Sequence, residues 1–248
     1  MGEFADIAET CDWTQGASDD LPFYLSLAQN AKGPILEMGA GTGRLTIPLA
    51  ELGKKLYALE SSETMLARAR KKWEAKGNGS HLVFVHGDLG RESFDEPFDL
   101  ILAPARALEH VLSDQERRDA FAACARHLCP SGVFALHVFG PPQDKNPALP
   151  EKSRFIGPTE EHGLLRFSWR EELDLATQTR TQYSKVVEVD GQQRTWEHAP
   201  VLLRWYTREM LDAFGEQAGL KVEGRYRNFR SEPYEKWSLH MVWVYRKP

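Results

Sequence analysis

Three alternate glycines carry the most informative chemistry of this 248-residue sequence. Gly39, Gly41 and Gly43 follow an apolar run that begins at Ile35 and contains the acidic Glu37. Glycine permits positive φ values and lets a ligand approach the backbone, while the first amides of a following helix face that ligand. The pattern predicts a strand, a cofactor-binding turn and a helix in succession.

The spacing of this turn narrows the choice of ligand. A dinucleotide fingerprint needs glycine or alanine three residues after Gly41, where the sequence has Arg44. A phosphate-binding P-loop would need Gly-Lys-Ser/Thr, which does not follow. In the remaining pattern, Glu37 leads into a GxGxG turn. This pattern resembles motif I of the class I S-adenosylmethionine-dependent methyltransferases.

Two further carboxylates stand at the ends of predicted strands. The strand Lys55–Leu59 leads into Glu60, and a carboxylate there can accept hydrogen bonds from both hydroxyls of a ribose. The strand Leu82–His86 leads into Asp88, in a segment that resembles the family's adenine motif, where the Asp side chain and the amide of Leu89 read the base. The order of these motifs matches the family.

Two more strands complete the resemblance. Phe98–Ala103 is similar to the strand whose tail forms the floor beneath the methyl group, and Val133–Val138 follows the turn residues 130–132. Four strand-helix units and this fifth strand cover roughly residues 33–140. The resemblance implies S-adenosyl-L-methionine as cofactor, S-adenosyl-L-homocysteine as product, and these cofactor-binding residues: Trp13, Tyr24, Glu37, Gly39, Ala40, Gly41, Gly43, Arg44, Glu60, Ser61, Met65, Asp88, Leu89 and Ala103.

The implied reaction is an in-line displacement in which a lone pair attacks the sulfonium methyl group. Alignment and exclusion of water can supply most of the catalysis, and a general base helps only when the nucleophile carries a proton. Glu109 and His110 follow the fourth strand and point about 100° apart on a helix. His110 is the favoured base because its ordinary pKa lies near neutrality, although it could equally pack the floor. Glu109 could instead pair with Arg106.

The sequence beyond residue 140 departs from a plain doubly wound sheet. Three extended segments, Leu164–Glu172, Ala176–Val189 and Arg194–Tyr206, predict an antiparallel insertion, with a hairpin turn at Asp190-Gly191. Thr207 predicts the N-cap of a helix that closes near Gly219. A final strand pair is expected at residues 221–229 and 237–245.

The expected fold is therefore α/β: a Rossmann-like, doubly wound, seven-stranded sheet with an antiparallel last strand, plus an inserted antiparallel β lid. Residues 1–145 would form N-terminal cap helices and the cofactor-binding core, residues 146–206 the lid over the substrate pocket, and residues 207–248 the helix and strand pair that complete the sheet. Such a lid resembles that of natural-product and glycine/sarcosine-type N-methyltransferases.

The lid is rich in aromatic side chains. A packed lid core explains them by default, since alternate strand residues share one face. The functional alternative is a flat aromatic or heteroaromatic substrate held between rings and polar anchors. The substrate-binding candidates are Arg106, Trp169, Arg204 and Tyr206.

Composition excludes several classes of partner. The net charge of −5 provides no overall basic surface for nucleic acid, and no apolar stretch reaches the length of a membrane span. The three cysteines are too scattered for a disulfide framework or a zinc site, so a reducing cytoplasm is the expected compartment and no metal is expected. We expect a small-molecule acceptor and a monomer or homodimer.

The function predicted from sequence is methyl transfer to a nitrogen of a small molecule, with an aromatic heterocycle of secondary metabolism as one candidate. A small-molecule O-methyltransferase is the first alternative, and a non-catalytic S-adenosylmethionine-binding protein is the second. A dinucleotide oxidoreductase remains a third reading of the glycine turn. Methylation of nucleic-acid bases and metal-dependent catechol methylation lack their signatures after the fourth strand.

Overall fold

A seven-stranded sheet organises the larger of two compact units in this chain. The computed structural model describes residues 5–15, 19–77, 79–88, 92–142, 148–159, 162–190 and 194–248. The larger unit comprises residues 19–143 and 205–248, and the smaller comprises residues 1–18 and 144–204. The expected division differed at both borders, since residues 1–18 group with the inserted sheet and residues 205–206 with the core.

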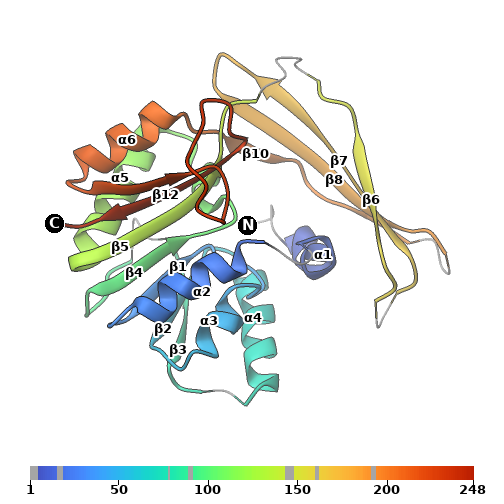
Figure 1. Ribbon diagram of the computed structural model, residues 1–248. Helices are drawn as coiled ribbons and strands as arrows, with labels where there is room; N and C mark the ends of the chain where they lie inside the picture. The colour runs from blue at the N-terminus through green and yellow to red at the C-terminus, as the bar shows by residue number, and fades with distance from the viewer. Residues whose placement is uncertain are drawn as a thin grey trace. The chain divides into compact units, whose positions relative to one another are not determined.

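The large sheet has the strand order β11-β12-β5-β4-β1-β2-β3 (Figure 1). Its strands are β1 (Ile35–Met38), β2 (Leu56–Glu60), β3 (Leu82–His86), β4 (Phe98–Ala103), β5 (Leu128–Phe139), β11 (Lys221–Tyr226) and β12 (His240–Arg246). All neighbouring pairs are parallel except those of β12, which runs antiparallel to both β5 and β11. The predicted fold class, with an antiparallel last strand, is confirmed.

Helices cover both faces of this sheet (Figure 1). The helices α2 (Leu21–Asn30), α3 (Thr46–Ala50) and α4 (Glu63–Ala75) lie on one face, and α5 (Asp114–His127) and α6 (Arg208–Gln217) lie on the other. Each face has its own buried apolar cluster, so every central strand is buried on both sides, as parallel sheets require.

The strand order places the loop after β1 beside the loop after β4. The chain passes from β1 outward through β2 to β3 and then returns to β4, which pairs with β1 on the other side. In open α/β sheets, ligands bind at the carboxyl ends of the strands where the strand order reverses. The glycine turn after β1 and the segment after β4 both leave from this switch point.

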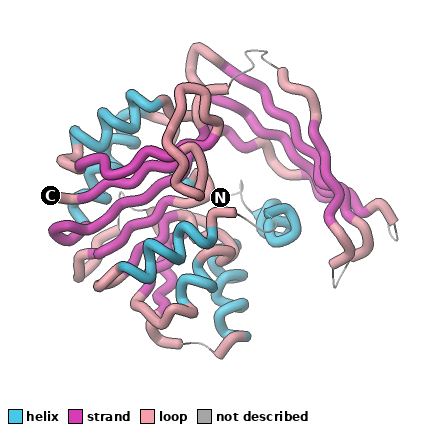
Figure 2. The backbone as a smooth tube through the Cα atoms, in the orientation of Figure 1, coloured by secondary structure: helices cyan, strands magenta, loops and turns pink. Residues whose placement is uncertain are grey.

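The smaller unit contains a five-stranded antiparallel sheet and the helix α1 (Ala5–Gln15), and Figure 2 draws its strands in magenta. Its strands are β6 (Lys152–Ile156), β7 (Leu165–Asp174), β8 (Thr179–Glu188), β9 (Thr195–Glu197) and β10 (Val201–Arg204). A buried imidazole joins α1 to this sheet, because His198 Nε2 lies 2.8 Å from Thr10 Oγ1 while its Nδ1 lies 2.8 Å from Ser184 Oγ.

Several local predictions are confirmed and others need correction. Thr207 caps α6 by accepting a hydrogen bond from the Met210 amide, and Gly219 follows the helix with φ +75°. The stretch 194–206 is two short strands, because Pro200 has no amide hydrogen to continue a ladder. The strand β6 was not predicted. The described part of the link between β3 and β4 contains no helix, contrary to the expected strand-helix unit there.

The expected hairpin turn at residues 190–191 falls partly outside the described residues, although β8 and β9 pair as antiparallel strands. No helix in the described part of the chain combines the length and apolar character needed to cross a membrane.

Candidate functional site

The glycine turn has the backbone geometry that its spacing predicts. Gly39, Gly41 and Gly43 have φ values of +72°, +56° and +89°. A Cβ on Gly39 would lie 2.8 Å from the Cβ of Ala107, and one on Gly43 would lie 3.1 Å from the Cβ of Ala69 in α4. These glycines are needed for a left-handed backbone and also for close packing against neighbouring segments.

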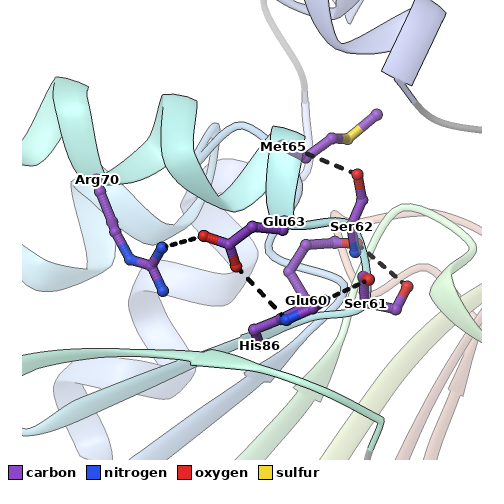
Figure 3. Close-up of polar contacts among 7 residues, drawn as sticks. All are labelled: Glu60, Ser61, Ser62, Glu63, Met65, Arg70 and His86. Atoms are coloured by element: carbon purple, nitrogen blue, oxygen red, sulfur yellow. Dashed lines mark hydrogen bonds and ion pairs between the residues drawn. The ribbon is translucent and has the colours of Figure 1, made fainter. Parts of the chain in front are cut away.

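Glu60 fixes the turn from the end of β2. Its Oε2 accepts a hydrogen bond from the Gly41 amide at 2.9 Å. Its Oε1 accepts one from the Ser62 amide at 2.8 Å (Figure 3). The Ser61 hydroxyl also donates to Oε1 at 3.3 Å. Hydrogen bonds to a charged acceptor are the stronger kind, so this buried carboxylate is held in one orientation. Its predicted ribose-binding role remains a prediction.

The start of α4 is built around the same carboxylate. Ser62 caps the helix by accepting a hydrogen bond from the Met65 amide, and the Met65 sulfur would lie 3.8 Å from a Cβ on Gly41. Outside this cluster, Glu63 pairs with Arg70 at 2.5 Å and approaches His86 at 3.6 Å (Figure 3). Glu63 is exposed, so it forms a separate surface network.

Glu37 is almost completely buried on β1. Its Oε2 accepts a hydrogen bond from the Thr46 hydroxyl at 2.6 Å. Burial raises the pKa of Glu37 to about 7, because desolvation disfavours the carboxylate more than the Thr46 hydrogen bond favours it. A cationic group nearby would favour the ionised form.

Arg44 lies in a bidentate ion pair. Its Nη1 and Nη2 lie 2.7 and 2.8 Å from the two carboxylate oxygens of Asp20, just before α2. The predicted contact of Arg44 with the cofactor's carboxylate remains a prediction. Asp20 itself was missed, although an acidic residue one position before Leu21-Pro22 is a recognisable helix-start signal.

Tyr24 is fully buried on α2 beside this ion pair. Among the described residues, no group forms a hydrogen bond with its hydroxyl. Burial and the negative charge of Asp20 raise its pKa well above the ordinary value, so the hydroxyl keeps its hydrogen. A buried hydroxyl without a partner is costly, and a polar atom of a ligand would satisfy it.

The remaining predicted cofactor residues are placed as follows. Asp88 is exposed just after β3, Ala103 is buried at the end of β4, and the Ala40 amide donates to the Leu59 carbonyl at 3.1 Å. Leu89 lies outside the described residues. Trp13 lies in the smaller unit, where its ring packs edge-on against Trp196.

The floor segment, residues 104–110, follows β4. Ala105 and Arg106 both have left-handed backbones, with φ values of 49° and 69°, and a short 3₁₀ helix, η1 (Ala107–His110), completes the segment. Two consecutive non-glycine residues with left-handed backbone angles store strain, and such strain occurs most often at functional sites. The Arg106 amide donates to the His137 carbonyl at 3.2 Å, and the Arg106 guanidinium lies 5.0 Å above the Phe139 ring.

The structure separates the two predicted bases. Glu109 is completely buried, and its Oε1 accepts a hydrogen bond from the Phe139 amide at 2.5 Å, which ties the floor segment to β5. This contact fixes Glu109 against β5, and its predicted catalytic role remains a prediction. Desolvation and the positive charge of Arg106 lower the pKa of His110 to about 4, although part of the residue remains exposed.

Tyr206 packs against the floor segment, and its predicted contact with a substrate remains a prediction. Its ring is completely buried, its hydroxyl donates to the Leu108 carbonyl at 3.1 Å, and the Arg117 guanidinium lies 3.8 Å from the ring centre. Arg117 is also buried and donates to the carbonyls of Val111 and Trp205. Fully buried aromatics of this kind pack the core.

The other substrate candidates lie in the smaller unit. Trp169 stacks on Phe167 with ring centres 5.2 Å apart and lines a cavity of about 180 Å³. Arg204 contacts Gln178 at 3.4 Å. Among the described residues, no three histidine, cysteine, aspartate or glutamate side chains form a metal-binding group.

The sequence is similar to those of known methyltransferases. Residues 35–132 match a family described as a methyltransferase domain. An uncharacterized methyltransferase of Staphylococcus carnosus is 34% identical over 110 residues, which cover 44% of this chain and 49% of that protein. The chain thus spans about half the length of the curated relatives that it matches.

Solved structures match over almost the whole chain. The CcbJ methyltransferase of Streptomyces caelestis has a TM-score of 0.83 and 27% identity, and the alignment covers 99% of this chain and 98% of that one. CalS10, an amino pentose methyltransferase of Micromonospora echinaspora, has a TM-score of 0.77 and 21% identity, with 98% and 97% covered. The second likeness shows a shared fold.

Proposed function

Because residues 35–132 form a methyltransferase domain of the class I S-adenosylmethionine-dependent type, we propose that the whole chain transfers a methyl group from S-adenosylmethionine to a nitrogen of a small molecule. The cofactor would supply a methyl group already activated by the positive sulfonium. The chain's own residues would bind the cofactor, orient the acceptor, exclude water and take up a proton.

The observation that carries the cofactor assignment is the oriented carboxylate of Glu60 beside the glycine turn. This carboxylate would accept the ribose hydroxyls, and Asp88 would read the adenine. The buried Tyr24 hydroxyl and Arg44 would face the cofactor's carboxylate, because both groups can donate to an anion and the hydroxyl forms no hydrogen bond within the described residues. Glu37 would face the ammonium, since a cation favours its ionised form.

Nitrogen is the proposed acceptor atom because the imidazoles near the floor segment are weak bases. The pKa of His110 is lowered to about 4, and the pKa of His240 is lowered by burial and by Arg106. Both are therefore neutral at neutral pH, and bases this weak suit an amine, which needs only the free lone pair of its neutral form to attack. An alcohol would need a far stronger base, so O-methylation is the second candidate.

A small molecule is the proposed acceptor class. The net charge of −5 does not favour nucleic acid, and the whole-chain likeness to CcbJ includes the inserted sheet. An amine-bearing sugar or an aromatic amine would suit this class, and the fold is shared with an amino pentose methyltransferase.

The test has two steps. Calorimetric titration with S-adenosylmethionine, S-adenosylhomocysteine and a nicotinamide dinucleotide should give micromolar binding of the first two alone. Release of S-adenosylhomocysteine should then be measured with benzylamine, an amino sugar and their hydroxyl counterparts. Transfer to the amines supports the proposal, and transfer to the hydroxyl counterparts alone would replace it with O-methylation. Cofactor binding without transfer to any acceptor would favour the non-catalytic alternative.

A further inference from the structure

Two histidines far apart in the sequence meet beside the floor segment. His137 Nε2 lies 3.0 Å from His240 Nδ1, and the ring planes are nearly parallel, with centres 5.2 Å apart and an interplanar angle of 21°. At this distance the two nitrogens share one hydrogen, so one ring donates and the other accepts. Neither the glycine motifs nor the spacing along the chain links these residues.

The sheet register explains the pairing. His240 begins β12 directly opposite Phe139, and His137 lies two positions before Phe139 on β5, so all three side chains share one face of the sheet. His137 is almost completely buried, whereas His240 is half-buried. The pair therefore has an inner ring and an outer ring.

The surroundings of the pair are aromatic and cationic. Phe139 and Phe229 lie 5.4 and 4.9 Å from the His137 ring, and Phe139 lies 4.9 Å from the His240 ring. Arg106 lies over Phe139 on the side of the floor segment. Burial and the charge of Arg106 lower the pKa of His240.

Three elements that pack against the pair or its aromatic neighbours carry other ionisable groups. The floor segment contributes Glu109, which holds the Phe139 amide, and His110. The loop after β11 contributes Arg227, which pairs with Glu232 at 2.8 Å. The helix α2 contributes Tyr24, which touches Phe229 with ring centres 5.9 Å apart.

We infer that His240 is the proton acceptor of the methyl-transfer reaction and that His137 is its positioning residue. This inference rests on the proposed function. The Nδ1–H of His240 donates to Nε2 of His137, so that Nε2 of His240 keeps its lone pair toward the acceptor. The structure gives the nitrogen positions, and this placement of the hydrogen is the inferred part.

The proton balance of this step is simple. One N–H bond of the acceptor's ammonium group breaks, and its proton forms a bond with Nε2 of His240. The acceptor nitrogen retains the electron pair, which then forms the N–C bond while the methyl–sulfur bond breaks and leaves its pair on sulfur. The imidazolium of His240 keeps its hydrogen bond to neutral His137, as a triad histidine keeps its bond to an orienting group.

The first experiment needs no acceptor. Long-range ¹H–¹⁵N spectra of histidine-labelled protein with S-adenosylhomocysteine report the tautomer of each ring. We expect His240 as the Nδ1–H tautomer in the wild type and in His137→Gln, whose amide can still accept, and loss of that preference in His137→Leu. An Nε2–H tautomer of His240 in the wild type would overturn the inference, even in a protein that methylates nothing.

The second experiment measures benzylamine methylation against pH. In His240→Asn the rate at pH 7 should fall about 10²-fold to 10³-fold, in the range typical of general base catalysis. The defect should shrink above pH 9, where benzylamine has lost its proton. Affinity for S-adenosylmethionine should remain unchanged. His81→Gln is the matched control, because His81 precedes β3 at the far edge of the sheet, where its Nε2 lies 2.8 Å from the Ala50 carbonyl and its ring packs against Trp73.

Two results would overturn the assignment. If His240→Asn lowers the methylation rate by the same factor at every pH, His240 has a structural role. The second result is a methylation rate that falls in His110→Asn and recovers at high pH, while His240→Asn keeps a rate near that of the wild type. His110 would then be the proton acceptor. If the wild type binds no S-adenosylmethionine, the proposed function itself fails, and the tautomer measurement still decides whether the pair exists.

Discussion

Gly39 and Ala107 lie in such close contact that a methyl group on Gly39 would sit 2.8 Å from the Ala107 Cβ. The first residue belongs to the predicted cofactor turn and the second to the floor segment that follows β4. The two loops of the switch point therefore pack directly against each other, and a displacement of one must move the other. This contact links the predicted cofactor turn to the floor segment.

Replacement of Gly39 by alanine tests this coupling. The left-handed φ alone costs about 1–2 kcal/mol in an alanine residue, and overpacking adds about 1–3 kcal/mol. Gly53→Ala is the matched control, because Gly53 has the same φ of +72° and no atom within 4 Å of its added Cβ. We expect urea denaturation to show a larger decrease in the free energy of unfolding for Gly39→Ala than for Gly53→Ala. Adding Ala107→Gly to Gly39→Ala should recover the extra loss in the free energy of unfolding. If the effects of the two substitutions on this free energy simply add, the contact is contradicted.

Glu60 and Glu63 provide a second matched pair, three residues apart (Figure 3). Glu60→Gln should weaken binding of S-adenosylmethionine about tenfold to a hundredfold, because a charge-assisted hydrogen bond contributes about 1.5–3 kcal/mol. Glu63→Gln removes only exposed pairs with Arg70 and His86 and should leave the affinity unchanged. Isothermal titration calorimetry measures both. Equal affinities for the two variants would show that Glu60 does not contact the cofactor.

Glu37 predicts a pH dependence of stability. Its folded pKa of about 7 lies above the ordinary value of 4.5, so the folded state binds an extra proton between these values. The corresponding stabilisation is complete below pH 4.5 and is lost as pH rises toward and through 7. Glu37→Gln has no such proton to lose, so its stability relative to the wild type should increase by roughly 2–3 kcal/mol between pH 4.5 and pH 8. Urea denaturation at both pH values checks this, and a constant difference would place the pKa of Glu37 near its ordinary value.

Tyr24→Phe should act in opposite directions on stability and on binding. Removal of a buried hydroxyl that has no hydrogen-bond partner in the described structure should leave the free protein equally stable or about 1 kcal/mol more stable. Affinity for S-adenosylmethionine should nevertheless fall about fivefold or more, because the hydroxyl would bind the cofactor's carboxylate.

Tyr245→Phe is the control for Tyr24→Phe. Tyr245 is equally buried, but its hydroxyl donates to the Leu211 carbonyl at 3.0 Å. Its loss should cost about 0.5–1.5 kcal/mol of stability and leave cofactor affinity unchanged. Destabilisation of the same size in both variants would mean that the Tyr24 hydroxyl has a protein partner.

Local sequence was sufficient for the parts of the site that lie within one loop. Gly39, Gly41 and Gly43 could be recognised because a left-handed turn restricts residue type at each position, and Glu60 because it ends a strand at a set distance from that turn. Extended segments and turn residues likewise predicted the inserted antiparallel sheet. These features depend on interactions between near neighbours in the chain, which residue type and spacing record directly.

Tertiary structure decided the parts that depend on pairing between distant strands. Glu109 and His110 are adjacent in sequence, yet only the packing of η1 against β5 buries one of them on the Phe139 amide. Tyr206 is buried by Arg117 of α5 and by the floor segment, which its place in an aromatic stretch did not reveal. His137 and His240 meet across 103 positions because β12 inserts antiparallel beside β5. Residue type records the local backbone that a position requires, whereas the partner of a side chain is set by strand register and helix packing over the whole chain.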